Sequence, residues 1–273
     1  MADGMRESVA VRPGVCSIAL RQLSSDEVVR LAESSGAAGI EWGADVHVPP
    51  GDAAGAERLA ERCRDAGIEC VSYGTYLQAG TADVLHQLGP VLDVAEALGV
   101  GNIRIWGELG ITPDAASDER RRVVDGVRAV VPLITGRGFT ASLEYHRQTI
   151  TATAESAAAL LRQIDDPRFF VYWQPDGPGS VADLVAEYRS VAARVSHLHL
   201  FAWRSYEDRY PLVAWRYLWR EILRHSREPG LWGRDRFALI EHVKDDRPEQ
   251  LAADLATLTS WLSVRQTEGE NRS

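Results

Sequence analysis

Short apolar runs alternate with longer amphipathic runs along this chain, and the alternation repeats without a change in composition from about residue 14 to residue 264. The short runs resemble β-strands and the longer runs resemble α-helices. We expect eight strands, at residues 14–20, 38–43, 68–74, 102–107, 140–146, 169–175, 197–203 and 236–243. Strands that alternate with helices predict parallel βα units.

The expected helices carry recognisable start and stop signals. One begins at Ser24 or Ser25, where a hydroxyl can cap the first turn, another near Asp118, and a third at Thr153 or Glu155. The last begins at Pro248, because proline is tolerated in the first helical turn. Four glycines are placed to end helices in a left-handed conformation: Gly36, Gly67, Gly99 and Gly138.

Eight strands, each followed by a helix, in about 250 residues have the size and order of a TIM barrel. The fold class is therefore predicted to be α/β, a single-domain (β/α)8 TIM barrel over residues 13–264, with flexible segments at residues 1–12 and 265–273. A doubly wound open sheet is the alternative. It has little support, because no GxGxxG sequence follows the first strand.

Composition limits the function further. The 273 residues are 45% hydrophobic, enough for one large core, and a net charge of -9 argues against nucleic acid as a partner. No apolar run has transmembrane length and the first dozen residues do not resemble a signal peptide, so we expect a cytoplasmic protein without a membrane partner. Three cysteines without a CxxC pair indicate neither a disulfide framework nor a structural zinc site.

Four strands in the second half of the chain end in residues that can hold a metal ion. They are Glu144, Gln174, His199 and Glu241, separated by helix-length intervals of 30, 25 and 42 residues. Active sites of TIM barrels form at the carboxyl ends of the strands, so the four side chains are expected to meet there. Side chains two apart share a face, which also turns His197 and His146 inward. A divalent ion would satisfy both glutamates.

Each residue has a plainer interpretation when considered alone. His199 can be a buried imidazole bonded to a carbonyl, Glu241 can form a salt bridge to Arg104, and Gln174 can simply precede a proline turn. Their joint appearance on successive strands favours the metal site. Four other histidines, among them His242, are interpreted as incidental because they lie in loops, in helices or on an outer strand face.

These residues resemble the sugar phosphate isomerase/epimerase superfamily, the xylose-isomerase-like TIM barrels, over essentially the whole chain. Members carry Glu, Asp, His and Glu on the fifth to eighth strands around Mn, Co, Mg or Zn, and Glu144, His199 and Glu241 match directly. Gln174 departs from the usual Asp. Closer still is a branch with YWQP on the sixth strand and LEYH on the fifth, in which Gln is the fourth ligand; Asp176 is the alternative ligand.

The resemblance implies that Glu144 and Glu241 are both metal ligands and the catalytic acid/base pair. They would move a proton next to a carbonyl while the ion, Mn²⁺ before Mg²⁺, Co²⁺ or Zn²⁺, stabilises an ene-diolate. An amide in place of a carboxylate makes the ion a stronger Lewis acid that is held less tightly. The predicted function is a metal-dependent isomerase or epimerase of a sugar or sugar derivative.

Side chains at other strand ends are candidates for the wall that binds a sugar or polyol: Glu41, Tyr73, Trp106, Glu108, His146, Trp173, His197, Trp203 and Arg204. The segment at residues 202–219, rich in aromatic and charged residues, is predicted to be a lid or a homodimer contact. Two other functions stay open: a lyase or dehydratase acting on a keto-sugar, cyclitol or glycoside, and an inactive barrel that only binds or scaffolds.

Overall fold

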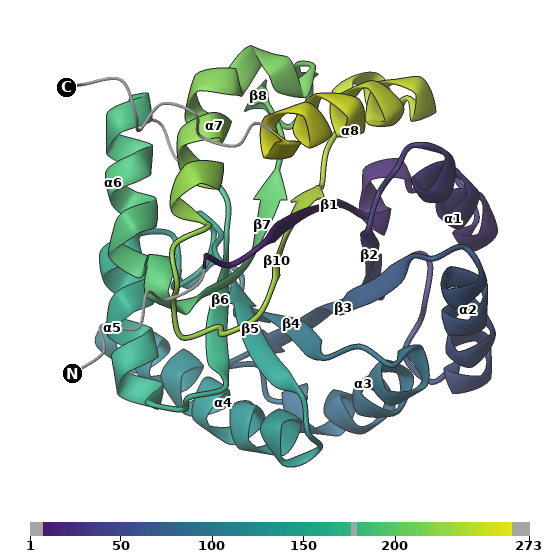
Figure 1. Ribbon diagram of the computed structural model, residues 1–273. Coiled ribbons are helices and arrows are strands. Elements are labelled where there is room, and N and C mark those ends of the chain that lie inside the picture. The colour runs from purple at the N-terminus through teal and green to yellow at the C-terminus, as the bar shows by residue number, and fades with distance from the viewer. Residues whose placement is uncertain (1–7, 176–178, 264–273) are drawn as a thin grey trace, which may run out of the picture.

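Eight parallel strands close into a barrel in the computed structural model, which describes residues 8–175 and 179–263 (Figure 1). Around the barrel the strands follow the order β1, β10, β7, β6, β5, β4, β3, β2, and then return to β1. Helices α1 to α8 surround this barrel, which confirms the predicted (β/α)8 architecture. Asp176 lies outside the described residues.

The elements have the following bounds. The barrel strands are β1 Val11–Cys16, β2 Gly39–Gly43, β3 Glu69–Ala79, β4 Asn102–Gly107, β5 Thr140–Glu144, β6 Phe169–Trp173, β7 Val195–Leu200 and β10 Arg236–Ile240. The helices are α1 Ser25–Ser34, α2 Ala53–Asp65, α3 Val84–Leu98, α4 Ser117–Gly136, α5 Ala154–Ile164, α6 Val181–Val191, α7 Arg216–His225 and α8 Pro248–Ser263.

The helix signals in the sequence are confirmed. Ser24 caps α1 in a reciprocal arrangement with Glu27, and the Thr153 hydroxyl accepts a hydrogen bond at the start of α5. The four predicted glycines all have positive φ angles, between 68° and 93°. Since L side chains rarely adopt this conformation, these positions favour glycine.

Three segments differ most from the expected strands. β3 continues to Ala79, beyond the expected end at residue 74. The first strand begins earlier, at Val11, and ends at Cys16, because a 3₁₀ turn over Ser17–Leu20 follows it. The buried Ser17 hydroxyl accepts a hydrogen bond from the Gly43 amide at 2.9 Å, which holds this turn against β2. The predicted lid segment forms a short hairpin, β8 Trp203–Ser205 with β9 Asp208–Arg209, and a 3₁₀ turn before α7.

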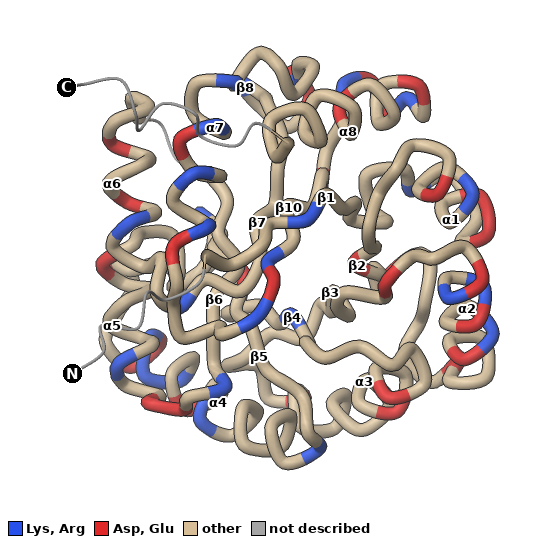
Figure 2. Tube along the Cα trace, viewed as in Figure 1, with Lys and Arg blue, Asp and Glu red and all other residues tan. Residues whose placement is uncertain are grey.

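The core has two parts. Apolar side chains fill the layer between the strands and the helices, and a smaller cluster of Val71, Tyr172, Phe237 and Leu239 fills the barrel interior. Most charged positions follow the surrounding helices (Figure 2). Charged side chains inside the barrel are therefore exceptions that need partners. Among the described residues, no helix is both long and apolar enough to cross a membrane.

Candidate metal and catalytic site

Three of the four predicted strand-end residues converge on one side of the ring of the fourth, His199. Its Nδ1 atom lies 3.3 Å from Gln174 Oε1, 3.4 Å from Glu241 Oε1 and 4.0 Å from Glu144 Oε1. Ligand atoms of Glu144, His199 and Glu241 all lie within 4.8 Å of one another. Four acceptor-rich side chains from four strands thus share one small volume.

The register of the strands brings these side chains to the same place. Glu144 is the last residue of β5, while Gln174 and Glu241 directly follow β6 and β10. His199 pairs in register with Leu239, two residues before Glu241. Because alternate residues face the barrel interior, all four side chains point inward at its carboxyl end. All four are buried.

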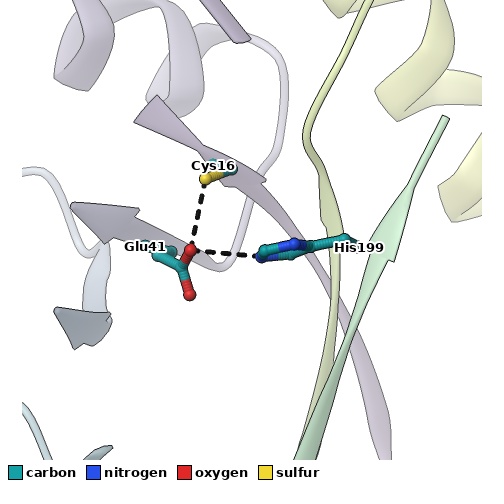
Figure 3. A group of neighbouring side chains, drawn as sticks. All are labelled: Cys16, Glu41 and His199. Atoms are coloured by element: carbon teal, nitrogen blue, oxygen red, sulfur yellow. Dashed lines mark hydrogen bonds and ion pairs between the residues drawn. The ribbon is translucent and has the colours of Figure 1, made fainter. Parts of the chain in front are cut away.

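A third buried carboxylate, Glu41 of β2, lies at the Nε2 atom of the His199 ring (Figure 3). Its Oε1 atom is 3.1 Å from His199 Nε2 and 3.3 Å from the Cys16 thiol, which donates to it. Its Oε2 atom accepts a hydrogen bond of 2.7 Å from Ser72. Ser72 in turn accepts one of 2.8 Å from the Tyr172 hydroxyl.

Arg104 of β4 joins the two carboxylate groups. Its Nε donates to Glu41 at 3.0 Å and its Nη1 forms an ion pair with Glu144, and the three side chains are almost fully buried. Gly74 makes room for them, since a Cβ at this position would lie 2.7 Å from Arg104 Nη2 and 2.8 Å from Glu41 Oε1. Arg104 therefore pairs with Glu41 and Glu144. The alternative interpretation of the sequence, a salt bridge between Arg104 and Glu241, is wrong about the partner.

The electrostatic field of the cluster keeps two of its carboxylates, Glu41 and Glu241, ionised. Burial alone would raise the pKa of Glu41, but Arg104 and His199 outweigh it and hold this pKa well below its usual range. Burial also acts to raise the pKa of Glu241, and the opposing effect of His199, His242 and Arg104 lowers it. Burial, followed by the charge of Glu41, raises the pKa of Cys16, so its thiol stays protonated.

The donor set fits a divalent metal ion. Two carboxylates, one amide oxygen and one imidazole form an oxygen-rich set of the kind that Mn²⁺ or Mg²⁺ accepts. The buried side chains of the cluster include three carboxylates, those of Glu41, Glu144 and Glu241, and one guanidinium, that of Arg104. When His199 is neutral, two negative charges remain. A divalent cation neutralises this remainder.

Two pairs of aromatic rings flank the cluster. His146 packs on Trp106 with 4.6 Å between ring centroids, and burial lowers the pKa of His146 to about 4. His242, interpreted from the sequence as incidental, stacks on Trp203 with 5.0 Å between ring centroids, and its Nε2 atom lies 3.6 Å from Glu241 Oε2. β10 ends at Ile240, so the strand alternation no longer fixes the direction of His242.

Other candidates for the sugar-binding wall lie elsewhere. Tyr73 and Trp173 are fully buried: the Tyr73 hydroxyl bonds to the Val48 carbonyl, and Trp173 packs against rings of α6 and α7. Glu108 forms an ion pair with Arg122, and Arg204, 80% exposed, forms one with Asp208. The structure does not bring these four to the cluster. Alternation along β6 explains Trp173, since Tyr172 and Gln174 on either side of it face inward.

The sequence patterns did not identify Cys16, Ser72 and Tyr172 behind His199, and they paired Arg104 with Glu241 in place of Glu41 and Glu144. Arg104 had a visible signal. It stands in the apolar strand NIRIWG, on the face that alternation assigns to the interior. A buried guanidinium needs anionic partners, and the register of neighbouring strands supplies them. Cys16 pairs with Glu41 and Glu41 with Ser72 at one level of the barrel.

The fold and this site define the class of protein. The family model of the xylose isomerase-like TIM barrel matches residues 29–209, and the chain belongs to this family. A curated relative, 3-dehydroshikimate dehydratase of Bacillus anthracis, is 24% identical over 199 residues, which cover 68% of this chain and 69% of the relative.

Solved structures share the fold at lower identity. The crystal structure of the probable 3-DHS dehydratase from Bacillus anthracis superimposes with a TM-score of 0.75 at 19% identity, covering 91% of this chain and 99% of that one. The 3-keto-D-glucoside 4-epimerase of E. coli gives 0.67 at 14% identity, covering 92% and 99%. A family protein from Mycobacterium smegmatis, crystallised in complex with magnesium, gives 0.66 at 14% identity, covering 94% and 98%.

Proposed function

We propose that this protein is a divalent-metal-dependent isomerase or epimerase that moves a proton next to the carbonyl of a sugar or sugar derivative. The observation that carries the proposal is the convergence of Glu144, Gln174 and Glu241 oxygens on Nδ1 of His199. These four residues would hold the ion, with Mn²⁺ as the first candidate. When bound, the ion supplies Lewis acidity that stabilises negative charge developing on the substrate.

The two ligand carboxylates are in different environments. Glu144 forms an ion pair with the buried guanidinium of Arg104, whereas the side chain of Glu241 lies against the rings of His199 and His242. A guanidinium partner reduces the basicity of a carboxylate. Glu241 is therefore the better base, and it would take the proton from the carbon next to the carbonyl.

The fate of that proton separates the outcomes. If Glu241 returns it to the former carbonyl carbon, and the proton of the neighbouring hydroxyl passes to the former carbonyl oxygen, the substrate is isomerised. If Glu144 protonates the same carbon from the opposite side, the substrate is epimerised, and Glu144 must then carry a proton while it remains beside Arg104. The ring pairs Trp106 with His146 and Trp203 with His242 would cover the apolar faces of a sugar.

A dehydratase is the second candidate, because the curated relative and one structural neighbour are named as 3-dehydroshikimate dehydratases. Abstraction of the proton by the same Glu241, followed by loss of a hydroxyl group as water, would convert a keto compound into an unsaturated product. Elimination creates a conjugated system and new ultraviolet absorbance, and isomerisation does not.

Solvent isotope exchange tests the shared step. The protein, loaded with Mn²⁺, is incubated in D₂O with D-psicose, a 3-keto-D-glucoside and 3-dehydroshikimate, and each compound is analysed by NMR. We expect deuterium to enter the carbon next to the carbonyl of at least one compound, and its product distinguishes isomerisation from dehydration. If no compound exchanges above the level of protein treated with chelator, the proposal is wrong for these substrate classes.

A further inference from the structure

Glu41 cannot contact a substrate in this structure, although it was a candidate for the sugar-binding wall. None of its side chain is exposed, and its two oxygens are surrounded by Cys16, Ser72, Arg104 and His199. Gly74 leaves the space that the Glu41–Arg104 pair occupies. A buried carboxylate with a full set of donors and a prepared space has a function inside the barrel.

A second metal ion is one function to consider, since ligand atoms of Cys16, Glu41 and His199 lie within 4.8 Å of one another. Arg104 argues against it. Its guanidinium donates to Glu41 Oε1 at 3.0 Å, on the same oxygen that faces His199 and Cys16. A cation placed there would meet a buried positive charge at close range. The guanidinium already is the counterion of Glu41.

The contact between Glu41 and His199 places a proton on one ring nitrogen. An ionised carboxylate only accepts hydrogen bonds, so His199 Nε2, 3.1 Å from Glu41 Oε1, has to be the donor. In a neutral ring the other nitrogen, Nδ1, is then without a proton. Nδ1 is the atom that faces the oxygens of Gln174 and Glu241.

We propose that Glu41 is a positioning residue. It holds His199 in the tautomer that presents the Nδ1 lone pair to the metal ion, while Arg104, Ser72 and Cys16 keep the Glu41 carboxylate in place. This inference rests on the metal site of the proposed function. Hydrogen bonds of this kind, from a ligand histidine to a carboxylate, fix ring orientation and increase the basicity of the ligand nitrogen.

The first experiment measures the tautomer directly in metal-free wild-type protein. Histidine ring nitrogens are labelled with ¹⁵N, the protein is prepared in EDTA, and the His199 signals are assigned by their loss in His199→Asn. We expect a protonated Nε2. An unprotonated Nε2 in the folded wild-type protein overturns the proposal, whatever the protein does with metal ions.

The second experiment compares variants. Glu41→Met has similar length but no acceptor, and Glu41→Gln keeps an oxygen acceptor. The matched control is Glu69→Met, which also removes a strand glutamate paired with an arginine, Arg12, but at the amino end of the barrel. Circular dichroism establishes that each variant is folded, and Mn²⁺ affinity is measured from the free-ion electron paramagnetic resonance signal.

Loss of such a carboxylate partner typically weakens metal binding 10- to 100-fold, so we expect a loss of about that size in Glu41→Met. Glu41→Gln should recover most of the affinity, and Glu69→Met should match wild type. Folded Glu41→Met that binds Mn²⁺ as tightly as wild type overturns the proposal. If wild type itself binds no Mn²⁺, the proposed function fails, and the tautomer of His199 still decides the role of Glu41.

Discussion

His197 and His199 stand two residues apart on β7 and face the same interior, and the Tyr172 ring packs against both, yet the rest of their surroundings differ. His199 lies among Glu41, Gln174 and Glu241 at the carboxyl end of the barrel. His197 lies one level deeper, where its Nδ1 accepts a hydrogen bond of 2.9 Å from the Phe237 amide. The rings of Tyr172, Trp232 and Phe237 pack around it.

The two histidines mark two levels of the barrel interior: a charged level around His199 and a packing level of neutral groups around His197. Below His199 the polar groups bond to one another as neutral partners: Asn102 donates to Ser142, and Ser142 shares a hydrogen bond with Ser196. Burial lowers the pKa of His197 to about 3, so it stays uncharged at neutral pH. The same residue type on the same strand is therefore a candidate ligand at one level and a packing element at the next.

The strongest test of the charged level is Glu241→Gln, which keeps the shape of the side chain but removes its basicity. General base catalysis contributes about 10²- to 10⁴-fold, and we expect deuterium exchange into a responsive substrate to slow by a factor in that range. Glu69→Gln, at the other end of the barrel, is the control. Equal exchange rates in Glu241→Gln and wild type would remove Glu241 from the chemistry.

The two histidines themselves give the next largest effect. His199→Asn removes the imidazole on which the ligand set converges, and we expect Mn²⁺ affinity to fall about 100-fold or more. His197→Asn retains a side-chain acceptor for the Phe237 amide and should bind Mn²⁺ within a few-fold of wild type. Isothermal titration calorimetry measures both, and equal losses in the two variants would contradict the separation into levels.

Gln174→Glu is expected to change metal binding in the opposite direction. The added carboxylate increases the negative charge around the ion, so affinity should rise by roughly tenfold while the Lewis acidity of the ion falls. Calorimetry with Mn²⁺ measures the first effect and deuterium exchange the second. A variant that binds Mn²⁺ more weakly than wild type would argue that Gln174 is not a ligand.

The smallest expected effect is on how the stability of the protein depends on pH, and it comes from His197 in the packing level. The unfolded chain protonates His197 near its ordinary value of 6.5, and the folded protein does so only near 3. Below pH 6.5 the unfolded state therefore binds more protons, and stability falls as pH decreases towards 3. Between pH 6.5 and 5.5 this loss is about 1 kcal/mol. Urea unfolding at pH 7.5 and 5.5 should show a smaller loss in His197→Asn than in wild type.

The sequence is sufficient to predict the barrel and the places of Glu144, Gln174, His199 and Glu241 at or near the ends of their strands, because both depend on local patterns. Alternation along β5 and β7 and the helix-length intervals identify Glu144 and His199 as neighbours from the sequence alone. The partners of Arg104 were beyond such patterns. They depend on how far neighbouring strands are staggered when the barrel closes, and this stagger brings Glu41 of β2 and Glu144 of β5 to one guanidinium.

Trp173 shows the opposite failure, in which an available pattern was not applied: alternation along β6 turns it outward to the helices, between the inward Tyr172 and Gln174. Tyr73 is different, because the register of β3 shifts between Cys70 and Ser72, so that Val71 and Ser72 both face the interior and Tyr73 turns outward. A strand residue therefore contributes to a barrel site only if its side chain faces the barrel interior and lies at the same height in the barrel as the site.

The guanidinium of Arg104 also bears on how the protein is made. It is covalently part of the chain, so one of the three interior carboxylates acquires its counterion at the moment the strands come together. Newly synthesised protein does not have to wait for a metal ion before the barrel can close, unlike small zinc domains that stay unfolded without their ion. We therefore expect folding and metal acquisition to be separable events, so that a metal ion would enter, leave or be exchanged in a barrel that is already formed.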